Sequence, residues 1–199
     1  MSHSMENARP AHGSPAHGSP AHGSPAQAGE PAAATERFRR VAGHYPTGLV
    51  LVTAPRPAPH LPPPAMVMGT FTSVSLQPTL VGFLPSKSST TWPRIRAAGR
   101  FCVNVLAADQ EQLCHSFTSA APGRWEIPHR ETATGSAALR DAIAWFDCEL
   151  AGEVDAGDHW FVTGAVRDLG VQRSAPPLVF LRGGYGACSP RPGTAVFQR

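Results

Sequence analysis

Residues 65–92, AMVMGTFTSVSLQPTLVGFLPSKSSTTW, constrain the fold most, because two strand patterns and a helix start follow one another there. Within FTSVSL, residues 71, 73 and 75 fall on one face and residues 72, 74 and 76 on the other, which is typical of a half-buried strand. Pro78 ends that run, since proline offers no N–H to a sheet. TLVGFL is apolar and too short for a core helix, so it predicts a buried strand.

A cluster of hydroxyl groups and one lysine, SKSSTT at residues 86–91, comes just before Pro93. Serine and threonine cap helix N-termini, and proline is tolerated in the first helical turn. The free N–H groups of a helix N-terminus also attract anions, and Lys87 would add a full positive charge. Two interpretations therefore stand: a capped surface helix without a ligand, or an anion-binding helix start.

Composition sets the outer limits. A chain of 199 residues with 42% hydrophobic content suits one domain with a core. A formal net charge of +3 is too small to indicate a nucleic-acid partner. The four cysteines form no CxxC pair and no zinc-ligand spacing, so we expect no metal site. No apolar run approaches the roughly 20 residues that span a bilayer, and no signal-peptide core is present, so we expect a cytoplasmic protein without a membrane partner.

The N-terminal 34 residues are of low complexity and contain three tandem copies of AHGSP. Proline, glycine, alanine and serine dominate, so this arm has little to bury and we expect disorder. Its histidines recur every five residues, a period that matches no single helical face and argues against a specific metal site. The sequence thus predicts a disordered arm at residues 1–34 and one domain at residues 35–199.

The rest of the domain is strand-rich. Thr35 is expected to cap a helix over ERFRRVAGH, and LVLVTA at 49–54 predicts a strand. A proline-rich loop leads to the central stretch, after which a helix should end at Gly99. RFCVNVL at 100–106 predicts a strand in which Asn104 is a structural polar group. An amphipathic helix over AADQEQLCHSF should follow, then a long loop at 119–138.

Two long strand patterns, AIAWFDCELAGEV and HWFVTGAVRDLGV, are expected to pair around a turn at residues 155–158. PPLVFLRGGY predicts a last strand, with loop from Ala187 onward. Strands with few intervening helices favour a mainly β fold, a barrel with peripheral helices, over a doubly wound parallel sheet. Neither GxGxxG nor GxxxxGKS occurs, so a Rossmann or P-loop nucleotide site is excluded.

Five blocks in order carry a family resemblance: FRxVxGHYPTGLVLVT, FTSVSLxP, SKSSTTW, FCVNVLAxxQ and GDH. Together they resemble the flavin reductase family, the FMN-binding split β-barrels of Greek-key type that serve as reductase components of two-component monooxygenases. The resemblance implies a homodimer with FMN or FAD at its interface. It implies an enzyme that oxidises NADH or NADPH and supplies reduced flavin to a separate monooxygenase.

The resemblance also implies a set of site residues. One segment would lie along the flavin ring and ribityl chain: Met66, Val67, Met68, Gly69 and Thr70. A second would hold the phosphate end: Leu84, Pro85, Ser86, Lys87, Ser88, Ser89, Thr90 and Thr91. Phe117 would close over the flavin, and His159 would be the catalytic residue that places the nicotinamide. The residues alone leave another interpretation of His159, in which it merely follows a turn capped by Asp158.

The sequence departs from the family pattern where Val67 replaces a hydroxyl side chain and Met68 adds bulk. Gln77 and Thr79 are further substitutions. These changes leave two alternatives beside the flavin reductase: an enzyme that uses a repurposed barrel pocket for another small organic molecule, and a non-catalytic flavin-binding module. The sequence does not choose between FMN and FAD, between NADH and NADPH, or among partner oxygenases.

Overall fold

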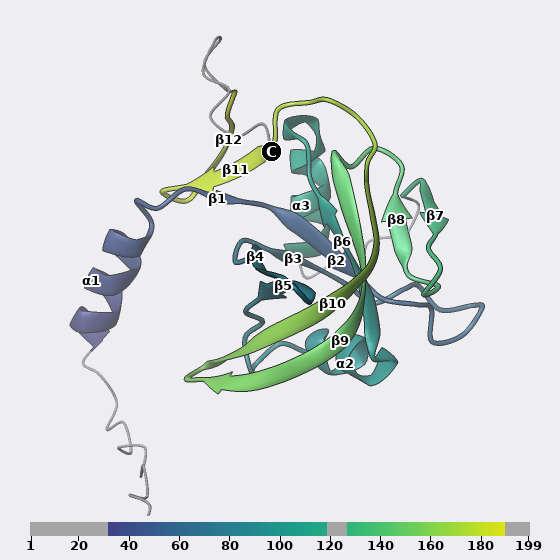
Figure 1. Cartoon of the computed structure of the whole chain (residues 1–199). Helices are drawn as coiled ribbons and strands as arrows, with labels where there is room; N and C mark the ends of the chain where they lie inside the picture. The colour runs from purple at the N-terminus through teal and green to yellow at the C-terminus, as the bar shows by residue number, and fades with distance from the viewer. Residues whose placement is uncertain (1–31, 119–126, 190–199) are drawn as a thin grey trace, which may run out of the picture.

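The computed structural model describes residues 32–118 and 127–189 (Figure 1). The expected disorder of residues 1–34 lies outside the described residues, except at residues 32–34, which belong to a helix.

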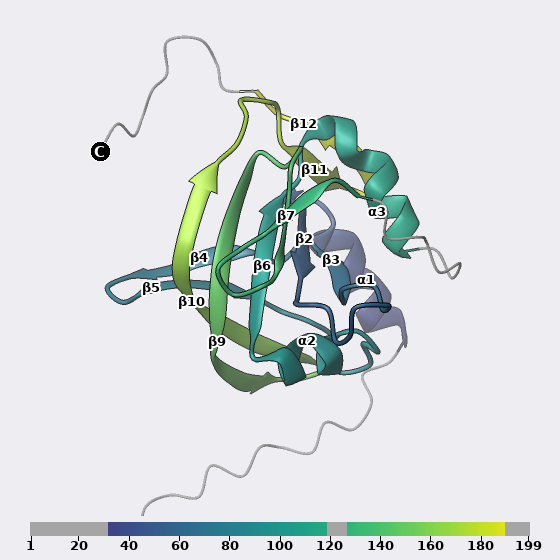
Figure 2. The same ribbon diagram turned by 90° about the vertical axis from the view of Figure 1, so that its right-hand side faces the viewer.

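A seven-stranded antiparallel sheet forms the body of the molecule and curves around the core (Figures 1 and 2). Every neighbouring pair in it is antiparallel, which confirms the prediction of a mainly β fold and excludes a doubly wound sheet. In spatial order its strands are β3 (Ala65–Met68), β2 (Val50–Thr53), β6 (Arg100–Val105), β9 (Ala144–Ala156), β10 (His159–Val171), β5 (Thr79–Phe83) and β4 (Thr72–Leu76).

Two small sheets flank this body. One has the order β1–β11–β12, and the other pairs β7 with β8. The predicted long loop at 119–138 is therefore wrong in its second half, where a polar hairpin forms. The single last strand predicted over PPLVFLRGGY is wrong, because Gly183, with φ of 81°, turns the chain into an additional strand that ends at Ala187. The strands are β1 (Thr47–Gly48), β11 (Leu178–Leu181), β12 (Gly184–Ala187), β7 (His129–Glu131) and β8 (Ala137–Leu139).

Helices lie at the periphery, and none in the described ranges is long and apolar enough to cross a membrane. α2 (Trp92–Ala98) ends at Gly99, whose φ of 67° is the left-handed conformation that glycine supplies at helix ends, as predicted. A 3₁₀ turn, η1 (Ala108–Gln110), leads into α3 (Glu111–Thr118), which matches the predicted amphipathic helix.

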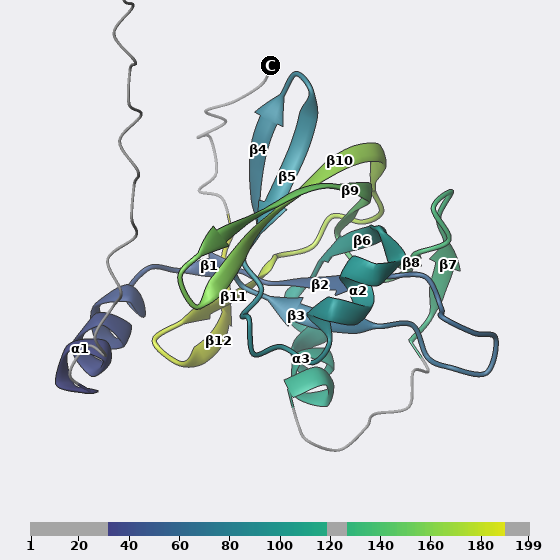
Figure 3. The same cartoon turned by 90° about the horizontal axis from the view of Figure 1, so that it is seen from below.

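α1 (Ala32–Ala42) begins before Thr35, so the prediction that Thr35 caps this helix is wrong. It stands apart from the barrel and has no buried residue (Figures 1 and 3). Phe38 and Val41, on its apolar face, are 71% and 65% exposed. α1 therefore offers an uncovered hydrophobic surface.

The core divides into two clusters. The first packs α2 against the sheet, where the Phe83 ring makes edge-to-face contacts with Trp92 and Phe101 at centroid distances of 5.6 and 5.3 Å. The second packs α3 against the opposite side, around buried residues such as Leu51 and Leu106. The sheet thus supports a helix on each side.

Two fully buried polar side chains tie the β7–β8 hairpin to the sheet. Asn104 donates to the carbonyl oxygens of Leu51 (3.1 Å) and Ala137 (3.2 Å) and accepts from the Leu139 N–H (2.8 Å). This confirms its predicted structural role. Asp147 is likewise enclosed and accepts hydrogen bonds from the hairpin.

The β4–β5 hairpin projects from the body (Figures 2 and 3) and turns at a cis peptide bond between Gln77 and Pro78. β5 is largely buried, as predicted. The prediction that β4 is half-buried is wrong, because β4 is the last strand of the sheet and most of its side chains are exposed, with Leu76 at 85%. Its alternating pattern reflects strand geometry rather than a covered face.

Candidate functional site

The loop after β5 is fastened to the turn between β9 and β10. Ser86 and His159 form an antiparallel bridge. It continues the register of the Phe83–Val162 pair, because Ser86 comes three residues after Phe83 and His159 three residues before Val162. On either side of the bridge, the Lys87 N–H donates to the Asp158 carbonyl and the Trp160 N–H donates to the Pro85 carbonyl, both at 2.9 Å. Sheet hydrogen bonds therefore bring two predicted parts of the site together.

The serine hydroxyls of this loop have separate roles. Ser89 Oγ accepts hydrogen bonds from the backbone N–H groups of Thr91 (3.3 Å) and Trp92 (3.1 Å), so it caps the start of α2. Ser86 Oγ and Ser88 Oγ lie 2.8 Å apart. The capped-helix interpretation therefore describes Ser89. Ser86, Ser88 and Lys87 do not cap the helix, so they are the polar groups of this loop left for the anion-binding interpretation.

Lys87 is held in place by the β9–β10 hairpin. Its Nζ donates to Asp155 Oδ2 at 2.6 Å and lies 4.8 Å from the centre of the Trp160 ring. The hydrogen bond from Lys87 lowers the pKa of Asp155 below its usual value. One third of the Lys87 side chain is exposed. A positioned and partly exposed positive charge thus lies near the start of the SKSSTT loop at residues 86–91.

His159 is oriented by its neighbour. Its Nδ1 lies 2.7 Å from Asp158 Oδ1, and this hydrogen bond lowers the pKa of Asp158. The side chain is 40% exposed, and Nε2 makes no hydrogen bond with any described residue. The turn itself depends on other residues: Asp155 Oδ1 accepts the Gly157 N–H at 3.2 Å, and Gly157 has φ of 73°. His159 therefore keeps one ring nitrogen without a hydrogen-bond partner among the described residues, and it is not needed for the turn.

The end of β3 reaches the same loop through Thr70, whose Oγ1 accepts the Leu84 N–H at 2.9 Å. Gly69 and Thr70 line a cavity of about 330 Å³ whose other wall is the segment before β2. A Cβ on Gly69 would lie 3.1 Å from Thr47 Oγ1, so glycine keeps this wall open. The cavity is lined by Tyr45, Pro46, Thr47, Gly48, Gly69, Thr70, Phe71 and Thr72.

The apolar predicted residues pack into the protein. Met68 is only 7% exposed, and both it and Met66 pack in the first core cluster. Val67 points to the other cluster, where Phe117 of α3 also packs. The core therefore accommodates the bulk of Met68. Val67 and Phe117 pack against the same buried cluster.

The structure adds residues that the sequence did not single out. Asp155 and Trp160 position Lys87, and Tyr45 and Thr47 face the cavity beside Thr70. Tyr45 is 75% exposed and lies in a loop, where binding residues are frequently found. Among the described residues, no group of three or more histidine, cysteine, aspartate or glutamate side chains is arranged to hold a metal ion.

Known proteins resemble the chain over most of its length. A flavin reductase from Pseudomonas putida is 46% identical over 150 residues, which cover 75% of this chain and 87% of the relative. The reductase subunit HsaB of a flavin-dependent monooxygenase from Rhodococcus jostii is 38% identical, with coverage of 81% and 85%.

Solved structures are also similar to this chain. Nitrilotriacetate monooxygenase component B from Mycobacterium thermoresistibile has a TM-score of 0.77 and 34% identity, and the match covers 84% of this chain and 94% of that one. The NADH:FAD oxidoreductase SgcE6 of Streptomyces globisporus, in complex with NAD and FAD fragments, has a TM-score of 0.72 and 27% identity, with coverage of 79% and 94%. These neighbours confirm the predicted split-barrel fold. The model of the flavin reductase like domain matches residues 42–189, and the chain belongs to that family.

Proposed function

We propose that this protein is an NAD(P)H-dependent flavin reductase that reduces FMN or FAD and supplies reduced flavin to a separate monooxygenase. The observation that carries the proposal is the Ser86–His159 bridge, which joins the loop of Ser86, Lys87 and Ser88 to the histidine that we assign to the nicotinamide. The names of the relatives support the same activity, because they are flavin reductases and reductase subunits of monooxygenases.

The residues present fit a flavin. Ser86, Ser88 and Lys87 supply hydroxyl donors and a positive charge for its phosphate. The open wall at Gly69 and Thr70 lets a ligand approach the backbone closely. Bound flavin would supply the hydride-accepting chemistry. The protein's part is to orient both cofactors, with His159 Nε2 available to hydrogen-bond a carboxamide or a ring edge.

A homodimer is part of this proposal. α1 exposes Phe38 and Val41, and the cavity beside Thr70 is bounded on one side by exposed Tyr45. A second copy that covers these apolar side chains would remove them from water and enclose the cavity. A cytoplasmic location is also proposed, since the buried thiols of Cys102 and Cys148 suit a reducing compartment.

The test is the absorbance at 340 nm of NADH or NADPH mixed with the purified protein, with and without added FMN or FAD. Flavin-dependent loss of absorbance is expected, and the preferred pair identifies both cofactors. No loss with any pair, in a folded protein, would contradict the reductase. Tight flavin retention without turnover would then indicate a binding module, and no flavin binding at all would indicate a repurposed pocket.

A further inference from the structure

A second cavity, of about 410 Å³, lies between the proline-rich loop before β3 and α2. Its polar lining residues are Arg56, Arg94 and Arg100, and we call it the arginine pocket. Its apolar wall comes from Pro55, Pro57 and Pro64 and from the alanines in the last turn of α2. The size, and the combination of apolar residues with three arginines, are typical of small-molecule sites.

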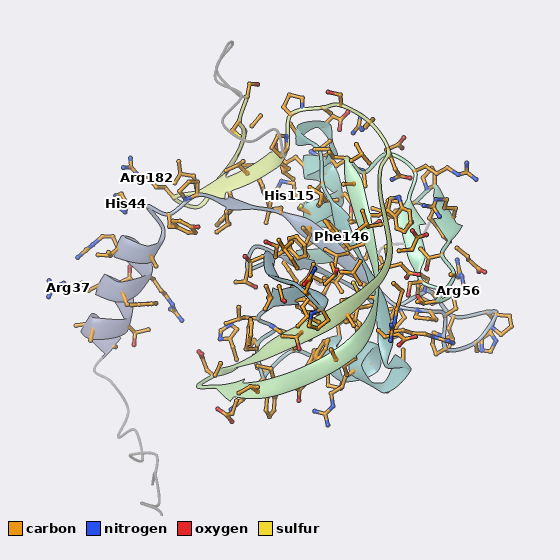
Figure 4. The ribbon with its side chains drawn as sticks, in the orientation of Figure 1. Arg37, His44, Arg56, His115, Phe146 and Arg182 are labelled. Carbon is orange, nitrogen blue, oxygen red and sulfur yellow. The ribbon has the colours of Figure 1, made fainter. Side chains whose placement is uncertain are left out.

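The arginine pocket is remote from the candidate flavin site. The two cavities share no lining residue. Arg56 lies on the side of the barrel opposite α1 and its Arg37 (Figure 4). The prolines that form its wall belong to the proline-rich loop between β2 and β3. The pocket is therefore a separate feature of the chain.

The positive charge of this pocket is uncompensated. The guanidinium groups of Arg94 and Arg100 make no hydrogen bond or ion pair with any described residue. Glu149 stands opposite Arg100 in the sheet, but its carboxylate binds Arg167 at 2.6 Å.

The other neighbouring charges are also accounted for. Glu153 binds Arg96 at 3.0 Å. Arg56 donates to the Leu61 carbonyl at 3.1 Å, and Glu131 borders a smaller adjacent cavity with Arg56. The C-terminal end of α2 contributes only a partial negative charge. The three guanidinium groups therefore dominate the field in the pocket.

We propose that the arginine pocket binds an organic oxyanion, a carboxylate or phosphate group attached to a small apolar body. Guanidinium groups match the planar geometry of carboxylate and phosphate oxygens and bind them through paired hydrogen bonds. The rigid proline and alanine wall offers apolar contact to the rest of the molecule at little entropic cost. Inorganic phosphate has no apolar body, so it can contact the arginines but not the proline and alanine wall.

The test is isothermal titration calorimetry of the full chain with phenyl phosphate, benzoate, benzamide and inorganic phosphate as probes. We expect phenyl phosphate or benzoate to bind, the neutral benzamide not to bind, and inorganic phosphate to bind more weakly. The first two probes distinguish a phosphate ligand from a carboxylate ligand. In Arg94→Gln the affinity should fall roughly tenfold, as for loss of a charge-assisted hydrogen bond. Arg140→Gln removes another exposed arginine and should leave the affinity unchanged.

Several outcomes would overturn the proposal. They are no heat with either organic anion, equal binding of benzamide, equal binding of inorganic phosphate, or equal loss in the two arginine variants. Because the readout is binding without flavin or nicotinamide, the result does not depend on the proposed reductase activity.

Discussion

Lys87 and Asp155 join the loop after β5 to the turn of the β9–β10 hairpin, with Nζ 2.6 Å from Oδ2. The lysine of the proposed phosphate site is therefore positioned by a residue 68 positions later in the chain. The pair is exposed, so its contribution to stability is small and its main effect is to place a charge.

Asp155→Asn should weaken flavin binding by about two- to fivefold, because Lys87 then samples more conformations. Fluorescence titration with FMN and FAD measures the dissociation constant. Glu149→Gln is the matched control, since it removes the exposed ion pair with Arg167 on the same two strands. An equal effect of the two variants would show that Lys87 needs no positioning.

The Lys87–Asp155 pair also predicts a pH dependence. Since Lys87 lowers the pKa of folded Asp155, the contribution of the pair to stability is present above the ordinary aspartate value of about 3.9. It is lost as the pH falls through the lowered value of the folded protein. The difference in melting temperature between wild type and Asp155→Asn should therefore shrink on acidification below about pH 4. A difference that grows would contradict this assignment.

His159→Ala should lower NAD(P)H oxidation roughly ten- to hundredfold while the flavin dissociation constant stays within about twofold. The reason is that Nε2 makes no hydrogen bond with a described residue and the turn does not depend on the side chain. Steady-state assays and flavin titration separate the two quantities. His60→Ala, in the exposed proline-rich loop, should change neither. Unchanged turnover in His159→Ala would make this histidine a structural residue.

Asp147→Ala should destabilise the protein by about 2–4 kcal/mol, because three buried donors lose their acceptor. Thr132 Oγ1 and Thr134 Oγ1 donate to Oδ1 at 2.7 and 2.6 Å, and the Thr134 N–H donates to Oδ2 at 3.1 Å. Urea unfolding measures the loss. The exposed Asp141→Ala is the control, and a similar small change in both would contradict the structural role of Asp147.

One cysteine should react quickly with a thiol reagent in the native protein. Burial raises the pKa of Cys114 to about 11 and that of Cys148 to about 12, and it also raises the pKa of Cys102. Thiolate is the reactive form, so these three should react only on unfolding, whereas Cys188 is exposed. Ellman titration should give one fast thiol, absent in Cys188→Ser, and four in denaturant.

The apolar face of α1 should stabilise the proposed dimer. In the double variant Phe38→Ser/Val41→Ser, sedimentation velocity should show a shift from dimer to monomer, because about 1.5–3 kcal/mol is lost for each apolar side chain that a partner buries. Glu36→Ser changes the same helix without removing apolar surface and should leave the dimer intact. A monomeric wild type would contradict the homodimer.

Local sequence patterns predicted the strands well where the hydrophobic periodicity matches the burial seen in the structure. β2, β5, β6 and the long β9–β10 pair follow from their apolar or alternating residues, and Gly99 ends α2 as glycine should. β4 shows the limit of this argument, because alternation does not reveal that a strand is the last in its sheet. The β7–β8 hairpin escaped prediction because its threonines and its backbone groups are hydrogen-bonded by Asp147 and Asn104, which are distant in sequence.

The candidate site was only partly predictable, because its contacts also join residues that are distant in sequence. The hydroxyl-rich loop and His159 could be identified from the family resemblance, and their roles remain predictions. Their bridge could not be read from the sequence, since it depends on the register between β5 and β10. Asp155 and Trp160 become relevant only once that register brings Lys87 beside them.

Because the Ser86–His159 bridge continues the β5–β10 ladder, the number of residues between Phe83 and Ser86 is fixed by the sheet register. One inserted residue there would move the loop by about 3.3 Å and reverse the side on which its side chains point. The turn at Gln77–Pro78 lies at the other end of β5, where added residues leave this spacing untouched. Relatives and engineered variants should therefore differ freely in the length of the β4–β5 turn while keeping the three-residue interval from Phe83 to Ser86 constant.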